Sequence, residues 1–340
     1  MQTVLLAILA LLPISAKLDG ADQPARVLRR DALFRVEFRD GLLRIEWRGE
    51  VPARDALRVR IVGCEAEWIV QTPPIQPRLP RDMTPDLEIE CRAGKHPEAD
   101  DYWLVTANSY SWKTALTGIR GGMTPWQVRC EFLQDANTAV LFVRDLSKRT
   151  NLRLQASDIL EMRMQNPREV RAYLLPLVRQ IAGEDLLLPG AADAYRVFQE
   201  VEPDPSTHAR VEPIIRRLDD PRASERKQAR RELADLPMRD TCFVVRMNPA
   251  TLSPEQLSAI REFLSNRSRR TAAEPGELRR NCGFLADCLE FDDPRIRAAA
   301  LREICILLAR GLDFDVNASG RRLTGRADEI REMLSRRRLP

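Results

Sequence analysis

The pattern closest to a metal site lies near the C-terminus of the 340-residue chain. Asp315, Asn317 and Ser319 place oxygen side chains at the first, third and fifth positions of a loop whose sixth residue is Gly320, as in an EF-hand calcium loop. The twelfth position holds Arg326, where a glutamate would complete the coordination of the cation. We therefore expect a polar turn between two helices, with no structural metal. Weak calcium binding by Asp315, Asn317 and Ser319 is the alternative.

The remaining glycine, histidine and acidic patterns predict no catalytic residue and no cofactor. Gly118–Gly122 lacks the Gly-Lys-Ser/Thr ending of a phosphate loop, so we expect a β turn there. The two histidines, His96 and His208, lie far from any Gly-x-Ser-x-Gly motif and are expected on the surface. Acidic pairs such as Asp100 and Asp101 leave one enzyme class open, a hydrolase that uses carboxylates in the β domain or at the domain junction.

The tryptophans allow a second kind of ligand, carbohydrate. All five precede residue 130, and Trp112 and Trp126 flank a predicted loop. These two are the candidates for outward-facing rings that would stack on a sugar, whereas most of the five are expected in the core.

The seven cysteines form no C-x-x-C pair and do not cluster with histidine, so they do not predict a zinc site. We expect most of them to be buried as small apolar side chains, with room for one disulfide.

The charge balance argues against a nucleic-acid partner. The chain has 54 Lys and Arg residues against 50 Asp and Glu residues, a net charge of +4, which is too small for that class. The basic surplus, including the run of three arginines at residues 336–338, is expected to be a solvated surface and helix end.

The first residues have the character of a signal peptide. An apolar run from Val4 to Leu12 is followed by Pro13 and by the small residues Ser15 and Ala16. The run is about half the length needed to span a bilayer. We therefore predict a signal peptide at residues 1–16, a linker at 17–30 and an exported, periplasmic or secreted, protein with no transmembrane segment after cleavage. A wrongly assigned start or a buried N-terminal strand are the alternatives.

A β-hairpin is the clearest local structure. Alternating apolar residues from Phe34 to Phe38 and from Leu43 to Trp47 are separated by Asp-Gly, the strongest short hairpin signal. Pairing about this turn places apolar residues opposite each other on one face and opposite charges on the other. Further short strands are expected at residues 57–61, 68–70, 87–91, 103–106, 126–132 and 139–143. Together they predict an antiparallel β-sandwich or open barrel at residues 31–155.

Helical periodicity replaces strand alternation from about residue 157. Five helix starts share one design, a capping residue followed by proline: Asn166-Pro167, Asp204-Pro205, Asp220-Pro221, Ser253-Pro254 and Asp293-Pro294. Pro176 falls inside the first helix and predicts a kink. Short helices with one apolar stripe must stack on neighbours, so residues 156–340 are predicted to form an α-helical array and the whole chain an α+β, two-domain protein.

Two segments of this array are alike. Leu218–Arg222 leads to the helical run 229–233, and Phe291–Arg295 leads to the run 300–304, with an Asp-Pro start and an alanine-rich helix in each. This pattern resembles the second half of a HEAT repeat over about residues 205–310. The copies lie about 73 residues apart, whereas HEAT repeats recur at about 40, so the resemblance implies an irregular HEAT-like array. The family implies a scaffold or binding surface.

The sequence alone leads to three functional hypotheses. The first is an exported, non-enzymatic interaction or scaffold protein whose partner is a protein or a cell-envelope polysaccharide. The alternatives are the carboxylate-based hydrolase and a carbohydrate-binding module that uses Trp112 and Trp126.

Overall fold

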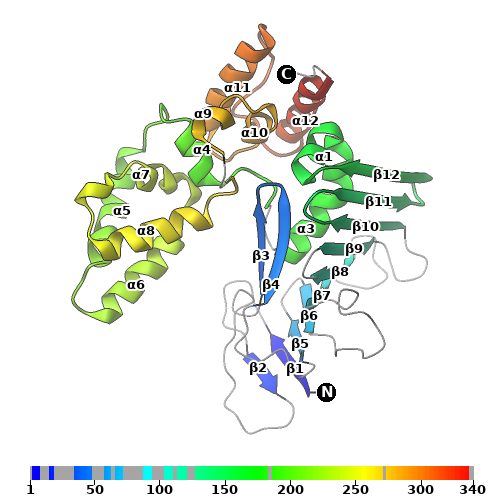
Figure 1. Ribbon diagram of the computed structural model, residues 1–340, viewed down its shortest axis with the longest axis horizontal. Coiled ribbons are helices and arrows are strands. Elements are labelled where there is room, and N and C mark those ends of the chain that lie inside the picture. The colour runs from blue at the N-terminus through cyan, green and yellow to red at the C-terminus, as the bar shows by residue number, and fades with distance from the viewer. Residues whose placement is uncertain are drawn as a thin grey trace. The chain divides into compact units, whose positions relative to one another are not determined.

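The computed structural model describes residues 2–7, 15–18, 34–47, 57–62, 66–71, 87–93, 103–109, 113–120, 127–182, 186–270 and 273–336. The chain divides into two compact units, Met1–Leu187 and Leu188–Pro340. Strands dominate the first unit and helices make up the second (Figure 1). The α+β, two-part fold predicted from the sequence is therefore confirmed.

The first unit is built on a ten-stranded sheet, counted over the described residues. Eight of its strands follow one another in space in chain order, each antiparallel to the next: β5 (Leu57–Val62), β6 (Ala66–Gln71), β7 (Leu87–Ala93), β8 (Trp103–Ser109), β9 (Thr114–Arg120), β10 (Val128–Gln134), β11 (Ala139–Asp145) and β12 (Thr150–Ala156). The absence of a helix between these successive strands, in the part of the chain that the structure describes, is consistent with a meander, because an antiparallel pair needs no crossover connection. β12 lies at one edge of the sheet.

Two further strands complete the other side of the sheet. β1 (Gln2–Ala7) pairs parallel with β5, and β2 (Ser15–Leu18) pairs antiparallel with β1. Both include residues of the segment predicted to be a signal peptide, for which a strand is one of the alternatives. Export itself stays a prediction.

The predicted hairpin is present with the predicted register. β3 (Phe34–Arg39) pairs with β4 (Leu42–Trp47) in a separate two-stranded sheet, with Phe38 opposite Leu43 and Val36 opposite Ile45. Asp40 and Gly41 have φ angles of +49° and +83°, the positive values that a type I′ turn requires at both central residues. Phe38, Leu43 and Ile45 are buried.

Side-chain hydrogen bonds tie this hairpin to the large sheet. Buried Gln134 of β10 donates from Nε2 to the carbonyl oxygen of Gly41 at 2.7 Å and accepts at Oε1 from the backbone N–H of Leu43 at 2.9 Å. The Thr114 hydroxyl donates to the carbonyl oxygen of Leu43 at 3.0 Å. The hairpin therefore forms a second layer over the sheet, rather than extending an edge of it.

The first helices complete this second layer. They are α1 (Ile159–Gln165), α2 (Pro167–Glu169), the π-helical segment η3 (Val170–Leu174) and α3 (Leu175–Ala182). α3 packs on β7, β8 and β9 and on the hairpin strand β3. Apolar residues of α1 to α3 and of the sheet form one core, so the compact unit extends to Leu187, beyond the predicted boundary at residue 155. The wider η3 turn directly precedes Pro176, where a proline removes one helical hydrogen bond and the sequence predicts a kink.

The closest approach of helix to sheet occurs at Gly118. A Cβ atom built on Gly118 would lie 2.0 Å from Cδ2 of Leu177, which is fully buried. The prediction of a β turn beginning at this glycine is wrong, because residues 118–120 belong to β9. Residues 121 and 122 lie outside the described part of the chain. β9 and β12 were not predicted as strands.

The second unit is an irregular helical array. Its helices are α4 (Ala191–Val197), α5 (Pro205–Arg217), α6 (Ala223–Ala234), α7 (Thr241–Val245), α8 (Pro254–Asn266), α9 (Pro275–Leu278), α10 (Cys282–Cys288), α11 (Pro294–Leu308) and α12 (Gly320–Arg336), with short 3₁₀ turns η4 (Met238–Asp240) and η5 (Pro249–Thr251). The lengths vary from 4 to 17 residues. Within the described part, no helix combines the length and the apolar character needed to cross a membrane.

Local capping explains three of the five predicted helix starts. Asp204, Ser253 and Asp293 each accept a backbone N–H through the side chain, and Ser253 forms a full capping box with Gln256. The predicted start at Asp220 is wrong: α6 begins at Ala223 with Arg222 as its N-cap residue, although Asp220 Oδ1 accepts from the backbone N–H of Arg222 just as Asp293 Oδ1 accepts from that of Arg295. Asn166 precedes α2 without a side-chain capping bond.

A buried ionic cluster joins α10 to α12. Arg331 is completely buried and lies 3.0 Å from Asp287, 2.5 Å from Glu290 and 2.8 Å from Asp328, measured between nitrogen and carboxylate oxygen atoms. A charge in the protein interior is tolerated only when it is paired in this way. The ion pairs of Arg331 therefore connect α12 to α10 and to the residues that follow it.

Candidate binding surface

The two faces of the large sheet differ in exposure. Along β10 the side chains of Val128, Cys130 and Phe132 are buried, and they belong to the core that also contains α1 to α3. The residues between them point to the opposite face. On that face Leu133 and Phe142 are 41% and 37% exposed, and the neighbouring arginines are also exposed.

The register of β10 to β12 sets charged and aromatic residues side by side on this outward face. Arg129 lies directly opposite Arg144, and Arg144 opposite Asn151. In the next row Glu131 lies opposite Phe142, and Phe142 opposite Arg153. Residues directly opposite each other on neighbouring strands have Cβ atoms about 4.5–5.5 Å apart, so each row acts as one continuous surface.

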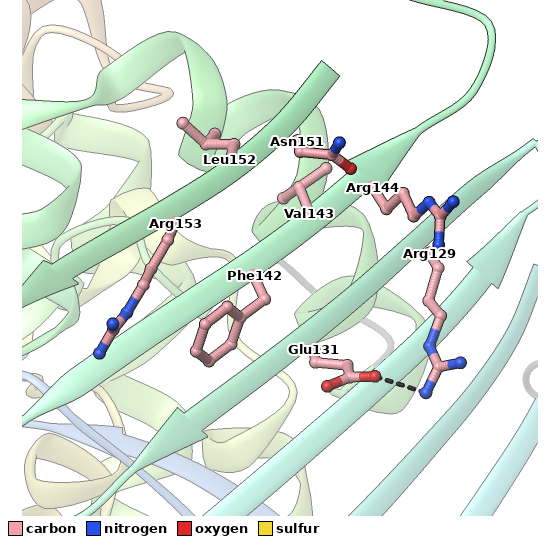
Figure 2. A pocket seen from close by; sticks show the side chains of 8 residues that line it. All are labelled: Arg129, Glu131, Phe142, Val143, Arg144, Asn151, Leu152 and Arg153. Atoms are coloured by element: carbon pink, nitrogen blue, oxygen red, sulfur yellow. Dashed lines mark ion pairs between the residues drawn. The ribbon is translucent and has the colours of Figure 1, made fainter. Parts of the chain in front are cut away.

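These rows surround an open hollow of about 520 Å³, lined by Arg129, Glu131, Phe142, Val143, Arg144, Asn151, Leu152 and Arg153. Figure 2 shows these side chains on three neighbouring strands, with an ion pair between Arg129 and Glu131. The Nη2 to Oε1 distance of that pair is 2.5 Å. The guanidinium carbon of Arg153 lies 5.3 Å from the centre of the Phe142 ring, in cation–π range. Val143 and Leu152 belong to the core side of their strands. We refer to the six outward residues, Arg129, Glu131, Phe142, Arg144, Asn151 and Arg153, as the arginine face.

The charge of the arginine face is unbalanced. Three guanidinium groups are accompanied by one carboxylate, that of Glu131. Like charges directly opposite each other are unfavourable in a sheet, and the ion pair of Arg129 with Glu131 offsets part of this charge. Guanidinium groups bind carboxylates and phosphates through paired hydrogen bonds and stay charged at all physiological pH values. The face can therefore bind an anion, but it does not offer the two carboxylates that a glycosidase requires.

A second polar cluster in this unit has a structural role. The Tyr173 hydroxyl donates to Oδ2 of Asp145 at 3.0 Å, and Oδ1 of Asp145 accepts from the Ser147 hydroxyl at 2.6 Å and from the backbone N–H of Lys148 at 3.0 Å. Burial raises the pKa of Tyr173, which keeps the phenol protonated as a donor. The cluster links the β11–β12 turn to η3. No local sequence pattern predicts it, because Asp145 and Tyr173 are 28 residues apart.

Trp112 and Trp126 lie outside the described residues, as do His96, Asp100 and Asp101. The carbohydrate-binding prediction therefore stays a prediction.

The calcium candidates Asp315, Asn317 and Ser319 lie in the turn before α12, where Oδ1 of Asp315 accepts from the backbone N–H of Asn317 at 2.9 Å. In the described ranges no three His, Cys, Asp or Glu side chains gather as metal ligands would.

The remaining candidate residues have ordinary structural surroundings. His208 is exposed on α5, with Nδ1 3.3 Å from a carboxylate oxygen of Glu212. Cys130, Cys242 and Cys288 are buried thiols, and Cys282 and Cys305 are half-buried thiols. Burial raises the pKa of Cys130 to about 12, so its thiol is protonated and unreactive.

Comparison of the chain with models of protein families, with curated proteins and with solved structures found no match in any of the three.

A signal for the arginine face was present in the sequence. The segments 128–134 and 139–145 alternate between apolar residues and residues that include Arg129, Glu131, Phe142 and Arg144. The apolar half of this alternation predicts the two strands. The residues that alternate with the apolar ones, Arg129, Glu131, Phe142 and Arg144, make up most of the outward face. Arg153 completes this face from β12, a strand that was not predicted.

Proposed function

We propose that this protein is a non-enzymatic interaction protein that binds an acidic protein partner on the arginine face. The observation that carries the proposal is the pair of directly opposed arginines, Arg129 and Arg144, beside exposed Phe142 on an accessible sheet face. A carboxylate of an acidic partner would interact favourably with these exposed guanidinium groups. Phe142 and Leu133 supply apolar surface that a partner would cover.

A protein partner accounts for the face better than the two alternatives. A polysaccharide site is typically built on rows of aromatic rings, and this face has a single ring, that of Phe142. A carboxylate-based hydrolase needs two carboxyl groups about 5–10 Å apart, and the hollow has one, that of Glu131.

The other parts of the chain support a scaffold role. The Asp-Pro starts and alanine-rich helices of α11, and the related segment that contains α6, resemble HEAT-like units, which act as binding scaffolds. The apolar run Val4–Leu12 supports export, with the partner in the periplasm or outside the cell. Peptide mapping of the mature N-terminus tests export, and an intact Met1 in protein from the native host would contradict it.

Binding of a fluorescent peptide tests the proposal. The probe is an eight-residue peptide of alternating Glu and Val, titrated with the full chain and with the variants Arg153→Gln and Arg144→Gln. We expect each variant to weaken binding about tenfold, since a charge-assisted hydrogen bond contributes about 1.5–3 kcal/mol.

Arg168→Gln is the matched control, because it removes the same charge from α2, on the helical side of the unit. We expect it to change the affinity less than twofold. Equal losses in all three variants would reduce the effect to net charge and refute the site. Binding of alginate, an acidic polysaccharide, without binding of the peptide would refute the protein partner.

A further inference from the structure

The edge strand β12 offers a mode of binding that the arginine face alone does not specify. β12 lies at the edge of the ten-stranded sheet and pairs with β11 along its whole length, from Thr150 opposite Asp145 to Ala156 opposite Ala139, without a bulge. An edge strand directs about half of its backbone N–H and C=O groups away from the sheet, where they can pair with another strand.

β12 lacks the features that usually protect such an edge. Proteins place proline, lysine, bulges or several charges on edge strands to prevent pairing. The segment Thr150–Ala156 contains no proline and no lysine, and its single charged residue is Arg153. The strand is also seven residues long, which is enough for a partner strand to pair over several residues.

The core side of this edge is incompletely covered. Leu152, Ala156 and the nearby Leu160 of α1 pack against the core cluster and remain half-exposed. In a strand added beside β12, every second side chain would lie next to these residues on the core face of the sheet. Apolar side chains at those positions would complete the layer.

The outward side of the same edge favours acidic residues. Asn151, Arg153 and Gln155 are exposed there, and Arg153 ends the row that runs from Glu131 through Phe142. A residue of the added strand opposite Arg153 would form a cross-strand pair with it, which is favourable for a carboxylate.

We infer that the acidic partner binds by adding an extended strand to β12, with acidic side chains on the arginine face and apolar side chains over Leu152 and Ala156. The inference rests on the proposed function and names the partner segment by its chemistry, an alternation of acidic and apolar residues. A second copy of this chain fits less well. Antiparallel pairing of two β12 strands about their centre would place Arg153 opposite Arg153.

Amide hydrogen exchange of the full chain tests the inference, with and without the alternating Glu and Val peptide. We expect the amides of β12 that do not donate to β11 to exchange at least about tenfold more slowly when the peptide is bound. The amides of β10 serve as the internal reference, since they stay paired with β9 and β11. Peptide binding that leaves the exchange of β12 unchanged would overturn strand addition and leave the proposed function standing.

Two N-methylated peptides give an independent readout. Alternate residues of a strand direct their N–H groups to the same side, so methylation of the Val nitrogens or of the Glu nitrogens blocks only one edge of the peptide. We expect one of the two to bind at least about tenfold more weakly than the parent peptide and the other to bind within about threefold. Equal affinities for the two methylated peptides would overturn the inference. No binding of the parent peptide would refute the proposed function as well.

Discussion

Replacing Gly118 by alanine tests whether α3 packs directly on β9. The added Cβ would lie 2.0 Å from Cδ2 and 3.2 Å from Cγ of Leu177. Carbon atoms in contact normally lie about 3.5–4.0 Å apart, so the shortest of these distances is about 1.5 Å too small. Leu177 is fully buried, and its side chain cannot relieve the overlap by moving into solvent.

The size of the effect follows from this overlap. Overpacking of a core by one carbon atom costs about 1–3 kcal/mol, which we expect for Gly118→Ala. Leu177→Ala alone leaves a cavity and costs about 2–5 kcal/mol. In the double variant the methyl group that Gly118→Ala adds occupies part of that cavity. We therefore expect the double variant to be less destabilised than the sum of the single variants, by about 1–3 kcal/mol.

Tryptophan fluorescence during urea unfolding measures these differences in the first unit alone, because all five tryptophans lie in it. Thr117→Ala is the control on the same strand, since that side chain points away from α3, and we expect a change within about 0.5 kcal/mol. A Gly118→Ala protein as stable as the wild type, or strictly additive effects of the two changes, would refute the packing argument.

Three further predictions concern buried groups. Arg331→Met leaves three carboxylates buried without their cation and is expected to destabilise the second unit by about 3–5 kcal/mol, more than Arg331→Lys, in chemical denaturation followed by circular dichroism. Burial opposes ionisation of Asp145, but hydrogen bonds from Ser147, Lys148 and Tyr173 outweigh it and lower the pKa of Asp145 below its ordinary 3.8. Ionised Asp145 therefore stabilises the first unit fully above about pH 5 and progressively less as the pH falls through 3.8 and below. The variant Asp145→Asn should make the stability of the unit less dependent on pH in this range, as measured by acid titration of tryptophan fluorescence. Cys130, with its pKa raised to about 12 by burial and by Asp145, should resist iodoacetamide in the native chain and react on unfolding, as peptide mapping would show; fast native labelling would contradict the buried placement.

Predictions that depend on neighbouring residues were the most successful. The hairpin register follows from one alternation that satisfies both faces and from the Asp40-Gly41 turn, and the structure has that register. The helix starts at Asp204, Ser253 and Asp293 follow from side-chain capping within three residues. Asp220 makes the same kind of bond, to the backbone N–H of Arg222, but α6 begins only at Ala223.

Predictions that depend on distant residues failed or were not made. A turn was predicted at Gly118–Gly122 because the stretch lacks the ending of a phosphate loop and precedes a strand, and only the packing of Leu177 explains why glycine is required at residue 118. The boundary at residue 155 followed the change in periodicity, yet α1 to α3 pack on the sheet and extend the unit to Leu187. The arginine face forms only because β10, β11 and β12 are neighbours in the sheet, and the sequence did not predict that order.

The sequence alone determines where the strands of the hairpin pair, where several of the helices begin and which composition belongs to each part of the chain. These features arise from hydrogen bonds and side-chain periodicity over a few residues, so a local pattern is enough to predict them. The tertiary structure decided which strand lies beside which, which helices cover the sheet and which arginines are brought opposite each other. These arrangements depend on the free energy of burying surfaces from distant segments against each other, such as Leu177 against Gly118. A local sequence pattern does not determine that free energy.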